Sequence, residues 1–356
     1  MYSDIEALLV LPSTSIHDAV ARLDAGRLGV VLIVDDGRRL LGTRTDGDIR
    51  RAVLAHVDLN LPIQTILDRK AGTAYATPIV ASEGTSRAGL ATLLRKHSIL
   101  HVPIVDGAGH VTGLAAAEEY IQETEPPIKA VIMAGGYGKR LSPLTAETPK
   151  PLLAVGDRPL IESIIGRLKD AGIQQIRIST HYKPEAFRSH LGDGSGMGVE
   201  LDYLVENEPL GTAGALGLMP KPSDTTLVIN GDILTDVDFR AMMRYHKEHA
   251  AAMTVAVKKV DIEIPYGVVE CDGPFVSRLT EKPEKTFFVN AGIYLIEPEV
   301  YGLIPSGQRL DMTALIQRVL DSGRKIASFP IREYWLDVGR HTDYEKAQEY
   351  ANKTAL

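Results

Sequence analysis

A glycine-rich, basic segment in the middle of the chain has the residue types that bind phosphate groups. Residues 135–138 read Gly-Gly-Tyr-Gly, and Lys139, Arg140 and Lys150 follow closely. Consecutive glycines let backbone N–H groups approach phosphate oxygens, and an Arg guanidinium grips two such oxygens at once. No P-loop string occurs, and position 141, where a dinucleotide-binding fingerprint needs glycine, is leucine. The segment predicts a phosphate site, with a simple tight turn as the alternative.

Two aspartates far apart in the sequence are candidate metal ligands. Asp232 follows an apolar run and a glycine, and Asp337 lies in the segment Trp-Leu-Asp-Val-Gly over 335–339. Mg²⁺ prefers carboxylate, water and phosphate oxygens, so the pair suits a Mg²⁺–nucleotide ligand. Taken singly, Asp232 could cap a helix and Asp337 could lie in a turn. The single cysteine and the spacing of the histidines do not form a zinc motif.

The sequence pattern around these residues is typical of an α/β fold. Short apolar runs at 129–134, 176–180 and 227–230 alternate with a helical pattern over 161–171. Such alternation predicts βαβ units and a mixed, mostly parallel, Rossmann-like sheet. Ligands of such sheets bind at the carboxyl ends of the strands. Gly135 and Asp232 both follow a strand directly and are expected at that edge.

The first third of the chain contains an internal repeat. Val31-Leu-Ile-Val-Asp35 and Val102-Pro-Ile-Val-Asp106 match at a constant offset of 71 residues, as do Gly42 and Gly113. A Thr-Ser pair precedes a helical stretch in each copy, at 14–15 and 85–86, and can cap that helix. Two copies of this length predict a paired small α/β module, with repeats at about 1–57 and 63–122. The proline pair at 126–127 indicates a linker over 123–127 before a second domain over 128–356.

The repeat resembles a tandem CBS-domain pair over residues 1–122. The first copy carries the pattern G-h-x-T-x-x-D with Thr45 and Asp48, whereas the second has Ala116 and Glu119 at those positions. The resemblance implies that Thr45 and Asp48 contact an adenine or guanine nucleotide that regulates the protein. The alternatives are that Thr45 and Asp48 only cap the helix that follows, and that the pair serves as a dimerisation module.

The second domain resembles the sugar-1-phosphate nucleotidyltransferases. The resemblance rests mainly on the pattern G-G-x-G-K-R-L-x-P-L-T over 135–145 and on P-K-P-L over 149–152. Further matches are the segments E-N-E-P-L-G-T-A-G at 206–214, G-D at 231–232, Y-G-V at 266–268, E-K-P at 281–283, N-x-G-x-Y at 290–294 and W-x-D-x-G at 335–339. Together they cover about residues 128–350.

The resemblance implies a role for each matched residue. The implied catalytic residues are Arg140, Lys150 and Asp232; the nucleotide-binding residues are Ala134, Gly135, Gly136, Gly138, Glu208, Gly211 and Thr212; the sugar-phosphate-binding residues are Gly267, Glu281, Lys282, Asn290 and Gly292; and the metal ligands are Asp232 and Asp337. The implied metal is Mg²⁺, with Mn²⁺ as a substitute.

The implied reaction transfers a nucleotidyl group from a nucleoside triphosphate to a sugar 1-phosphate and releases pyrophosphate. The segment over 208–214 is more similar to guanylyltransferases, so GTP is the expected nucleotide, with glucosamine 1-phosphate or mannose 1-phosphate as the sugar. The alternatives are uridylyl or thymidylyl transfer to a hexose 1-phosphate, and a catalytically inactive regulatory nucleotide-binding subunit. The implied context is nucleotide-sugar supply for cell-surface polysaccharides.

The amino-acid composition of the chain argues against several other classes of protein. The chain has 356 residues, a hydrophobic share of 44% and a formal net charge of −7. An acidic balance argues against a broad nucleic-acid-binding face but permits a local basic pocket. No apolar run has the length of a membrane span, and the acidic N-terminus does not read as a signal peptide. We therefore expect a cytoplasmic homo-oligomer, a dimer or tetramer, without membrane or nucleic-acid partners.

Overall fold

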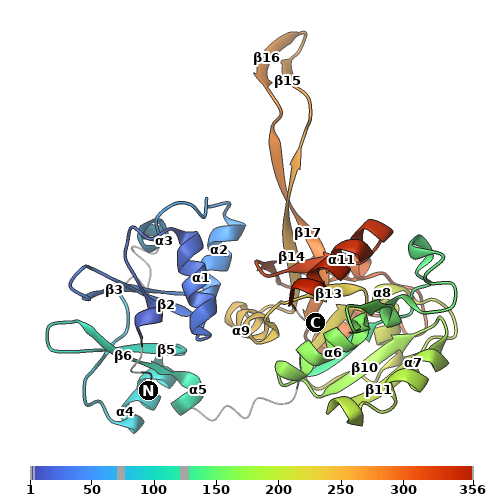
Figure 1. The fold of residues 1–356 in the computed structure, drawn as a ribbon, viewed down its shortest axis with the longest axis horizontal. Helices are drawn as coiled ribbons and strands as arrows, with labels where there is room; N and C mark the ends of the chain where they lie inside the picture. The colour runs from blue at the N-terminus through green and yellow to red at the C-terminus, as the bar shows by residue number, and fades with distance from the viewer. Residues whose placement is uncertain (1, 3–4, 70–76, 121–127, 355–356) are drawn as a thin grey trace. The chain divides into compact units, whose positions relative to one another are not determined.

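The structure is a computed structural model that describes residues 2, 5–69, 77–120 and 128–354. The chain divides into two compact units, Met1–Glu125 and Pro126–Leu356, each described here by itself (Figure 1). The linker expected over 123–127, and the last two residues of the second repeat, lie outside the described residues. None of the helices in the described part of the chain is long and apolar enough to span a membrane.

The first unit consists of two copies of one small α/β motif. In each copy a short strand pairs in parallel with a central strand, which pairs antiparallel with a third strand. The first copy contains η1 (Glu6–Leu8), β1 (Leu9–Val10), α1 (Ile16–Gly26), β2 (Val30–Val34), β3 (Leu40–Thr45), α2 (Asp46–Leu54) and α3 (Gln64–Arg69). The second contains β4 (Ala81–Ser82), α4 (Arg87–His97), β5 (His101–Val105), β6 (Val111–Ala116) and α5 (Ala117–Tyr120).

Local sequence signals define both copies. Ser15 accepts a hydrogen bond from the Asp18 N–H at the start of α1, and Ser86 accepts one from the Gly89 N–H at the start of α4. These contacts satisfy backbone donors that the first helical turn leaves free. Side chains from β2 and β6, including Leu32 and Leu114, share one apolar core, so the two copies form a single folded unit.

The second unit is built on a seven-stranded sheet in the order β11-β10-β7-β12-β17-β14-β18. Its strands are β7 (Lys129–Met133), β10 (Gln175–Thr180), β11 (Glu200–Val205), β12 (Thr226–Asn230), β14 (Met253–Glu263), β17 (Glu284–Ile296) and β18 (Ile326–Ile331). All neighbouring pairs are parallel except those made by β17, which is antiparallel to β12 and β14. The expected mixed, mostly parallel α/β sheet is confirmed.

Helices and short pairs of strands complete this unit. The helices are α6 (Leu160–Asp170), α7 (Pro184–Leu191), α8 (Gly211–Gly214), α9 (Phe239–His249), α10 (Met312–Asp321) and α11 (His341–Thr354), with 3-10 turns η2 (Lys139–Leu141), η3 (Lys150–Leu152), η4 (Ser195–Met197), η5 (Ala215–Leu218) and η6 (Pro298–Leu303). Three strand pairs lie outside the main sheet: β8 (Ala154–Val155) with β9 (Arg158–Pro159), β13 (Ile233–Thr235) with β19 (Trp335–Asp337), and β15 (Val268–Asp272) with β16 (Phe275–Thr280).

The core of the second unit holds the sheet and its helices together. Apolar side chains of β7, β10 and β12 are almost fully buried, among them Ile132, Ile178 and Ile229. Helix α6 packs Ile161, Ile164, Ile165 and Leu168 into the same cluster. A strand buried on both faces is continuously apolar, as residues 130–133 of β7 and 227–229 of β12 are, whereas β10 has Arg177 and Ser179 next to its isoleucines. The buried part of the sheet ends at the carboxyl ends of β7 and β12, where the apolar sequence is followed by Gly135 and Gly231.

One part of the second unit projects from this layer. Strands β14 and β17 continue past the sheet as a two-stranded ribbon, with β15 and β16 at its tip (Figure 1). Residues 258–290, called the arm below, include no buried residue.

Candidate active site

A cavity of about 490 Å³ opens at the carboxyl ends of β7 and β12. This edge is where a parallel α/β sheet binds its ligands. The cavity is lined by Met133, Ala134, Gly135, Gly136, Tyr137, Gly138, Lys139, Arg140, Lys150, Pro151, Glu206, Pro209, Gly211, Thr212, Asn230, Gly231, Asp232 and Gly339. Five segments predicted from the sequence, those that contain Gly135, Lys150, Gly211, Gly231 and Gly339, therefore meet around one cavity.

The glycine loop after β7 is shaped by contacts that exclude larger residues. Gly138 has a φ of 64°, and a Cβ there would lie 2.9 Å from the Thr145 Cγ2. The Thr145 hydroxyl donates to the Gly138 carbonyl oxygen at 2.9 Å, which holds the loop closed on itself. A Cβ on Gly135 would lie 2.6 Å from a Glu206 carboxylate oxygen. Glycine at these positions lets the backbone run along the cavity wall.

Lys150 is the central cation of the site. It is 8% exposed, and its Nζ lies 2.5 Å from the Asp232 Oδ2 and 3.8 Å from the Asp337 Oδ1. Pro149 and Pro151 flank it, and their fixed φ angles suit the turn that η3 makes at this point. A buried ammonium held by two carboxylates has little rotational freedom. Arg140 follows in the same cavity wall, on η2.

Asp232 and Asp337 come together through the pairing of β13 with β19. Ile233 is in register with Asp337, and the Val338 N–H donates to the Asp232 carbonyl oxygen at 3.0 Å. Loss of solvent raises the pKa of the Asp337 carboxyl, and the neighbouring Asp232 charge raises it further, whereas Lys150 and Arg140 oppose the shift. Two carboxylates and one ammonium therefore share a small volume at the cavity edge.

These residues fit a hard divalent cation. The Asp337 Oδ1 is buried and has no hydrogen-bond partner, so the site offers an oxygen that a cation would satisfy. In the part of the chain that the structure describes, no group of three or more His, Cys, Asp and Glu side chains converges as a complete metal cage. Mg²⁺ commonly takes only one or two protein carboxylates and fills its shell with water and substrate phosphates. Asp232 and Asp337 suit that mode of binding.

The segment after β11 supplies the opposite wall. Gly211 and Thr212, which were predicted to bind the nucleotide, line the cavity. Glu208, which was predicted to have the same role, does not line it. Gly211 has a φ of 78°, and a Cβ there would lie 2.5 Å from an Asp311 carboxylate oxygen. The Thr212 hydroxyl accepts a hydrogen bond from the Met312 N–H at 2.8 Å, which ties α8 to the start of α10.

Glu206 is a cavity residue that begins the matched segment 206–214 but received no role in our sequence analysis. It is 5% exposed; Ser179 donates a short hydrogen bond to its Oε1, and the Leu210 N–H donates to its Oε2 at 2.9 Å. One buried carboxylate thus connects β10, the glycine loop and the segment leading to Gly211. Its sequence signals were its place in that segment and its position directly after a strand, where a glutamate is also typical of an exposed loop.

Tyr137 and His181 form a second unpredicted feature of the wall. The His181 Nδ1–H donates to the Glu206 carbonyl oxygen at 2.9 Å, so its Nε2 is free to accept from the Tyr137 hydroxyl, also at 2.9 Å. The Lys139 ammonium lies 5.4 Å from the centre of the Tyr137 ring, within the range of a cation–π contact. The tyrosine ring is thereby fixed beside the glycine loop.

The predicted sugar-phosphate residues fall into two groups. Asn290, at the base of the arm, and Gly292 lie on β17 next to the cavity wall: a Cβ on Gly292 would lie 2.6 Å from the Asn230 Nδ2, and the Asn290 Oδ1 accepts from the Tyr294 hydroxyl at 2.9 Å. Gly267, Glu281 and Lys282 lie on the arm, and none of the three lines the cavity. Their role in sugar-phosphate binding remains a prediction.

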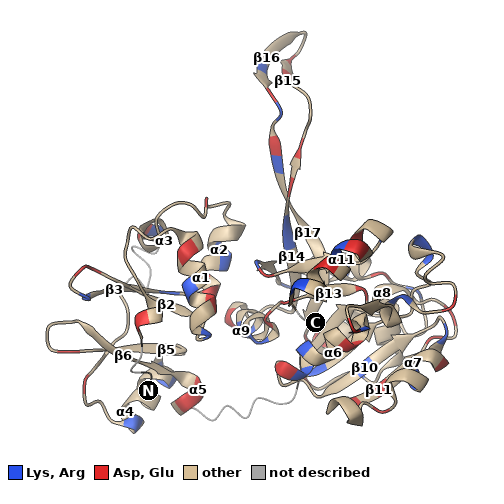
Figure 2. Cartoon of the chain, viewed as in Figure 1, with Lys and Arg blue, Asp and Glu red and all other residues tan. Residues whose placement is uncertain are grey.

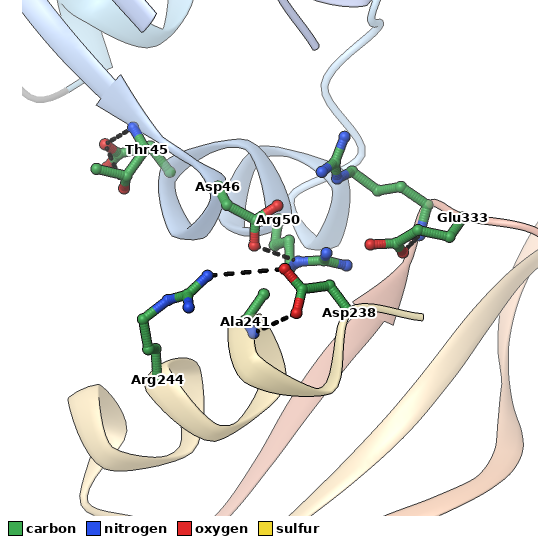
Figure 3. Close-up of polar contacts among 9 residues, drawn as sticks. Thr45, Asp46, Arg50, Asp238, Ala241, Arg244 and Glu333 are labelled. Atoms are coloured by element: carbon green, nitrogen blue, oxygen red, sulfur yellow. Dashed lines mark hydrogen bonds and ion pairs between the residues drawn. The ribbon is translucent and has the colours of Figure 1, made fainter. Parts of the chain in front are cut away.

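In the first unit, Thr45 lies at the start of α2 (Figure 3) and forms a capping box with Asp48. The Thr45 N–H donates to the Asp48 Oδ2 at 3.1 Å, and Arg51 binds the other Asp48 oxygen at 2.8 Å. Asp46, on the same helix, pairs with the fully buried Arg50 at 2.6 Å. The structure therefore shows the capping role, and nucleotide binding by Thr45 and Asp48 remains a prediction.

Comparison with known families matches both units. The nucleotidyl transferase family matches residues 129–354, and the CBS domain family matches residues 3–55, the first of the two copies. The chain is 36% identical over 230 residues to a mannose-1-phosphate guanyltransferase of Candida albicans, covering 61% of this chain and 62% of that protein. It is 32% identical over 226 residues to a mannose-1-phosphate guanylyltransferase of Mycobacterium tuberculosis, with the same coverage. The chain thus spans less than two thirds of the length of these curated relatives.

Solved structures agree with the fold of the second unit. A putative glucose-1-phosphate thymidylyltransferase from Bacillus anthracis, solved in complex with a sucrose, aligns at a TM-score of 0.53 and 31% identity, covering 63% of this chain and 95% of that chain. HddC from Yersinia pseudotuberculosis, complexed with GMP-PN, aligns at 0.51 and 25% identity, covering 63% and 99%. The family match extends over more than half of the sequence and includes every residue of the cavity. The chain therefore belongs to the nucleotidyl transferase family and carries a CBS domain at its N-terminus.

Proposed function

We propose that the chain is a sugar-1-phosphate guanylyltransferase that transfers GMP from GTP to a sugar 1-phosphate and releases pyrophosphate. The observation that carries the proposal is the meeting of the glycine loop, Arg140, Lys150 and Asp232 around one cavity, with Asp337 next to Lys150 at its edge. A catalytically inactive relative would be expected to lack one of these charged groups. All of them are present, which favours an enzyme over a purely regulatory nucleotide-binding subunit.

The reaction needs no nucleophile from the protein. A phosphate oxygen of the sugar 1-phosphate attacks the α-phosphorus of the triphosphate, one bond forms there, and the bond to pyrophosphate breaks. The protein has to hold two anions in line and neutralise the charge that develops on the leaving group. Arg140, with its planar fork, suits the leaving phosphates, and the buried Lys150 suits the α-phosphate and the incoming sugar phosphate.

Nucleotidyl transferases generally use a divalent metal, and we propose Mg²⁺ here, with Mn²⁺ as a substitute. Asp232 and Asp337 would hold it, because they converge on one point and Asp337 has an unsatisfied buried oxygen. When bound, the ion would add positive charge beside the phosphates.

The names of the relatives favour guanine and mannose. Both cited curated relatives are mannose-1-phosphate guanylyltransferases, whereas one similar solved structure is a putative thymidylyltransferase. The test is a matrix of ATP, CTP, GTP, UTP and dTTP against mannose, glucosamine and glucose 1-phosphates, read by pyrophosphate release. GTP with mannose 1-phosphate is expected to be fastest. Preference for glucosamine 1-phosphate would change the sugar only, and preference for dTTP or UTP would overturn the guanylyl assignment.

We also propose that the first unit binds an adenine or guanine nucleotide near Thr45 and Asp48. The support is the CBS family match and the presence of Thr45 and Asp48 together at the N-terminal end of α2. Calorimetric titration of the full chain with AMP, ATP and GTP, in the absence of sugar phosphate, would test it. Binding that persists when Lys150 is replaced by methionine would place the nucleotide outside the catalytic cavity. Binding that disappears in that variant would contradict a regulatory site.

A further inference from the structure

Two consecutive residues after β10, Tyr182 and Lys183, have their side chains on the loop that carries Arg140. This loop, residues 139–147 and called the cavity loop below, leads from the glycine loop toward Lys150, and most of its residues are exposed. Strands β7 and β10 are parallel neighbours, so the segments that follow their carboxyl ends lie next to each other. The sheet therefore brings Tyr182 and Lys183 to the cavity loop.

Tyr182 binds two backbone carbonyl groups of the cavity loop. Its hydroxyl donates to the Ala146 carbonyl oxygen at 2.8 Å and lies 3.4 Å from the Thr145 carbonyl oxygen. Thr145 is 4% exposed, and its own hydroxyl donates to the Gly138 carbonyl oxygen. Through Thr145, the contact made by Tyr182 therefore extends to the glycine loop.

Lys183 binds the end of the same loop. Its Nζ lies 3.1 Å from the Ala146 carbonyl oxygen, 2.9 Å from the Glu147 carbonyl oxygen and 2.9 Å from the Glu147 Oε2. An ammonium has three donors, so these three acceptors satisfy it completely. Hydrogen bonds from a charged donor are stronger than those between neutral groups. The whole cationic group of Lys183 is thus used to hold the loop.

The backbone of Lys183 is in an unfavourable conformation that its side-chain contacts explain. Lys183 has a φ of 49°, in the left-handed region, directly before Pro184 at the start of α7. Residues with a Cβ avoid this region, and glycine takes it readily. Such strain persists where the surrounding contacts hold it, and it occurs at functional sites. Here it is a lysine, and its ammonium binds the cavity loop.

Arg140 depends on this loop for its position. Among the residues that the structure describes, no hydrogen bond or ion pair holds the Arg140 guanidinium, which is exposed and faces Gly339. Acidic and basic residues are interspersed over the second unit (Figure 2), so binding of a triphosphate depends on where the few cations of the cavity lie. The backbone of the cavity loop therefore decides where Arg140 meets the phosphates.

We propose that Tyr182 and Lys183 are positioning residues, which hold the cavity loop so that Arg140 and the glycine loop meet the leaving phosphates of the nucleotide. This inference rests on the proposed nucleotidyl transfer. A displacement of about 1 Å in such a site costs about 10²-fold in rate. Lys150 lies outside the cavity loop and is held separately by Asp232. Loss of the two contacts is therefore expected to weaken use of the nucleotide and to spare the sugar 1-phosphate.

Steady-state kinetics of the full chain with Mg²⁺, GTP and mannose 1-phosphate test the proposal. Tyr182→Phe and Lys183→Met are each expected to raise the KM for GTP about threefold to tenfold, and the KM for mannose 1-phosphate should stay within about twofold. Lys169→Met is the matched control, because the Lys169 Nζ donates to the Met197 carbonyl oxygen at 2.8 Å and neither residue lines the cavity. Loss of folded protein alone would lower kcat and leave both KM values unchanged.

Hydrogen exchange provides a measurement that needs no activity. The Leu144 and Ala146 N–H groups donate within the cavity loop, so their exchange reports its opening. We expect faster exchange there in Tyr182→Phe and Lys183→Met than in the wild type, and no change in Lys169→Met.

A further variant separates the ammonium from the backbone of Lys183. Lys183→Gly suits the left-handed conformation but has no ammonium, so it should share the raised KM for GTP. An active wild type whose variants keep its KM values, or exchange at its rate, overturns this inference alone. A rise of both KM values also contradicts it, because the whole cavity would then be disturbed. A wild type that turns over no pair of substrates overturns the proposed function and this inference with it.

Discussion

Lys150 connects the two acidic residues of the site and is the residue on which its electrostatics depend. Its ammonium is nearly buried and touches Asp232. A buried charge without a partner is costly, so the lysine and the carboxylates stabilise each other while no ligand is present. A phosphate that enters the cavity can take over the role of Asp232 as a partner of Lys150. The site is therefore arranged to exchange one anion for another.

Replacing this lysine should remove most of the activity. Lys150→Met keeps a chain of similar length without its charge, and kcat/KM for pyrophosphate release is expected to fall about 10²-fold or more. Lys346→Met, on an exposed position of α11, is the matched control and should leave kcat/KM unchanged. A Lys150→Met enzyme with wild-type kinetics would contradict the assigned role.

Asp337 should show opposite effects on stability and on activity. Its carboxyl pKa is raised by burial and by Asp232, so the ionised form is less favourable in the folded protein than in the unfolded chain. Stability is therefore lost as the pH rises from the ordinary aspartate pKa through the raised one, and the loss persists at neutral pH. Asp337→Asn should raise the Tm of the metal-free protein at pH 7 by about 1–3 °C while lowering activity. Thermal melts of both proteins at pH 4 and pH 7 check this, because the gain in Tm of Asp337→Asn over the wild type should be smaller at pH 4.

Glu206 should matter through the wall that it supports. In Glu206→Gln, one of the two carboxylate oxygens becomes an NH₂ group, so either Ser179 or the Leu210 N–H loses its acceptor. The free energy of unfolding is expected to fall by about 1–3 kcal/mol, and the KM for the nucleotide to rise more than kcat falls. Denaturant titration together with steady-state kinetics separates these effects. Unchanged stability would mean that the buried carboxylate is dispensable.

The loop between β7 and η2 illustrates how an element restricts its residues. Gly138→Ala forces a left-handed backbone on alanine and brings its Cβ to 2.9 Å from Thr145, so we expect a loss of about 1–2 kcal/mol in stability and a large loss of activity. Gly136→Ala is the control, because a Cβ there meets nothing within 4 Å. Thermal melts of both variants should differ clearly. Equal melting temperatures would contradict the loop geometry described here.

Helices, strands and the glycine loop could be predicted because their signals are local. The caps at Ser15 and Ser86, and the strands that end at Gly135 and Gly231, follow from residues a few positions apart. The arm could not be predicted, because its sequence alternates like any half-buried hairpin and only the tertiary arrangement shows that nothing covers it. Glu206 was missed for the same reason: its burial depends on three segments that meet in space.

At the scale of the whole molecule, the chain joins a CBS domain to a nucleotidyl transferase domain. The two units have separate cores, and the first is formed by two copies that share apolar side chains across their sheets. The second copy lacks Thr and Asp at the positions of Thr45 and Asp48, having Ala116 and Glu119 instead. If the first unit binds nucleotide, we expect about one molecule per chain by calorimetry. Two equivalent sites would contradict this difference between the copies.

The central claim is that the cavity at the carboxyl ends of β7 and β12 transfers a nucleotide to a sugar phosphate. The most direct measurement is pyrophosphate release by the full chain supplied with Mg²⁺, GTP and mannose 1-phosphate, with the Lys150→Met variant in parallel. We predict release that requires both substrates and the metal, together with formation of the GDP-sugar, and that is nearly absent in the variant. Release that is equally fast in the variant, or no release with any pair of nucleoside triphosphate and sugar 1-phosphate, would contradict the account.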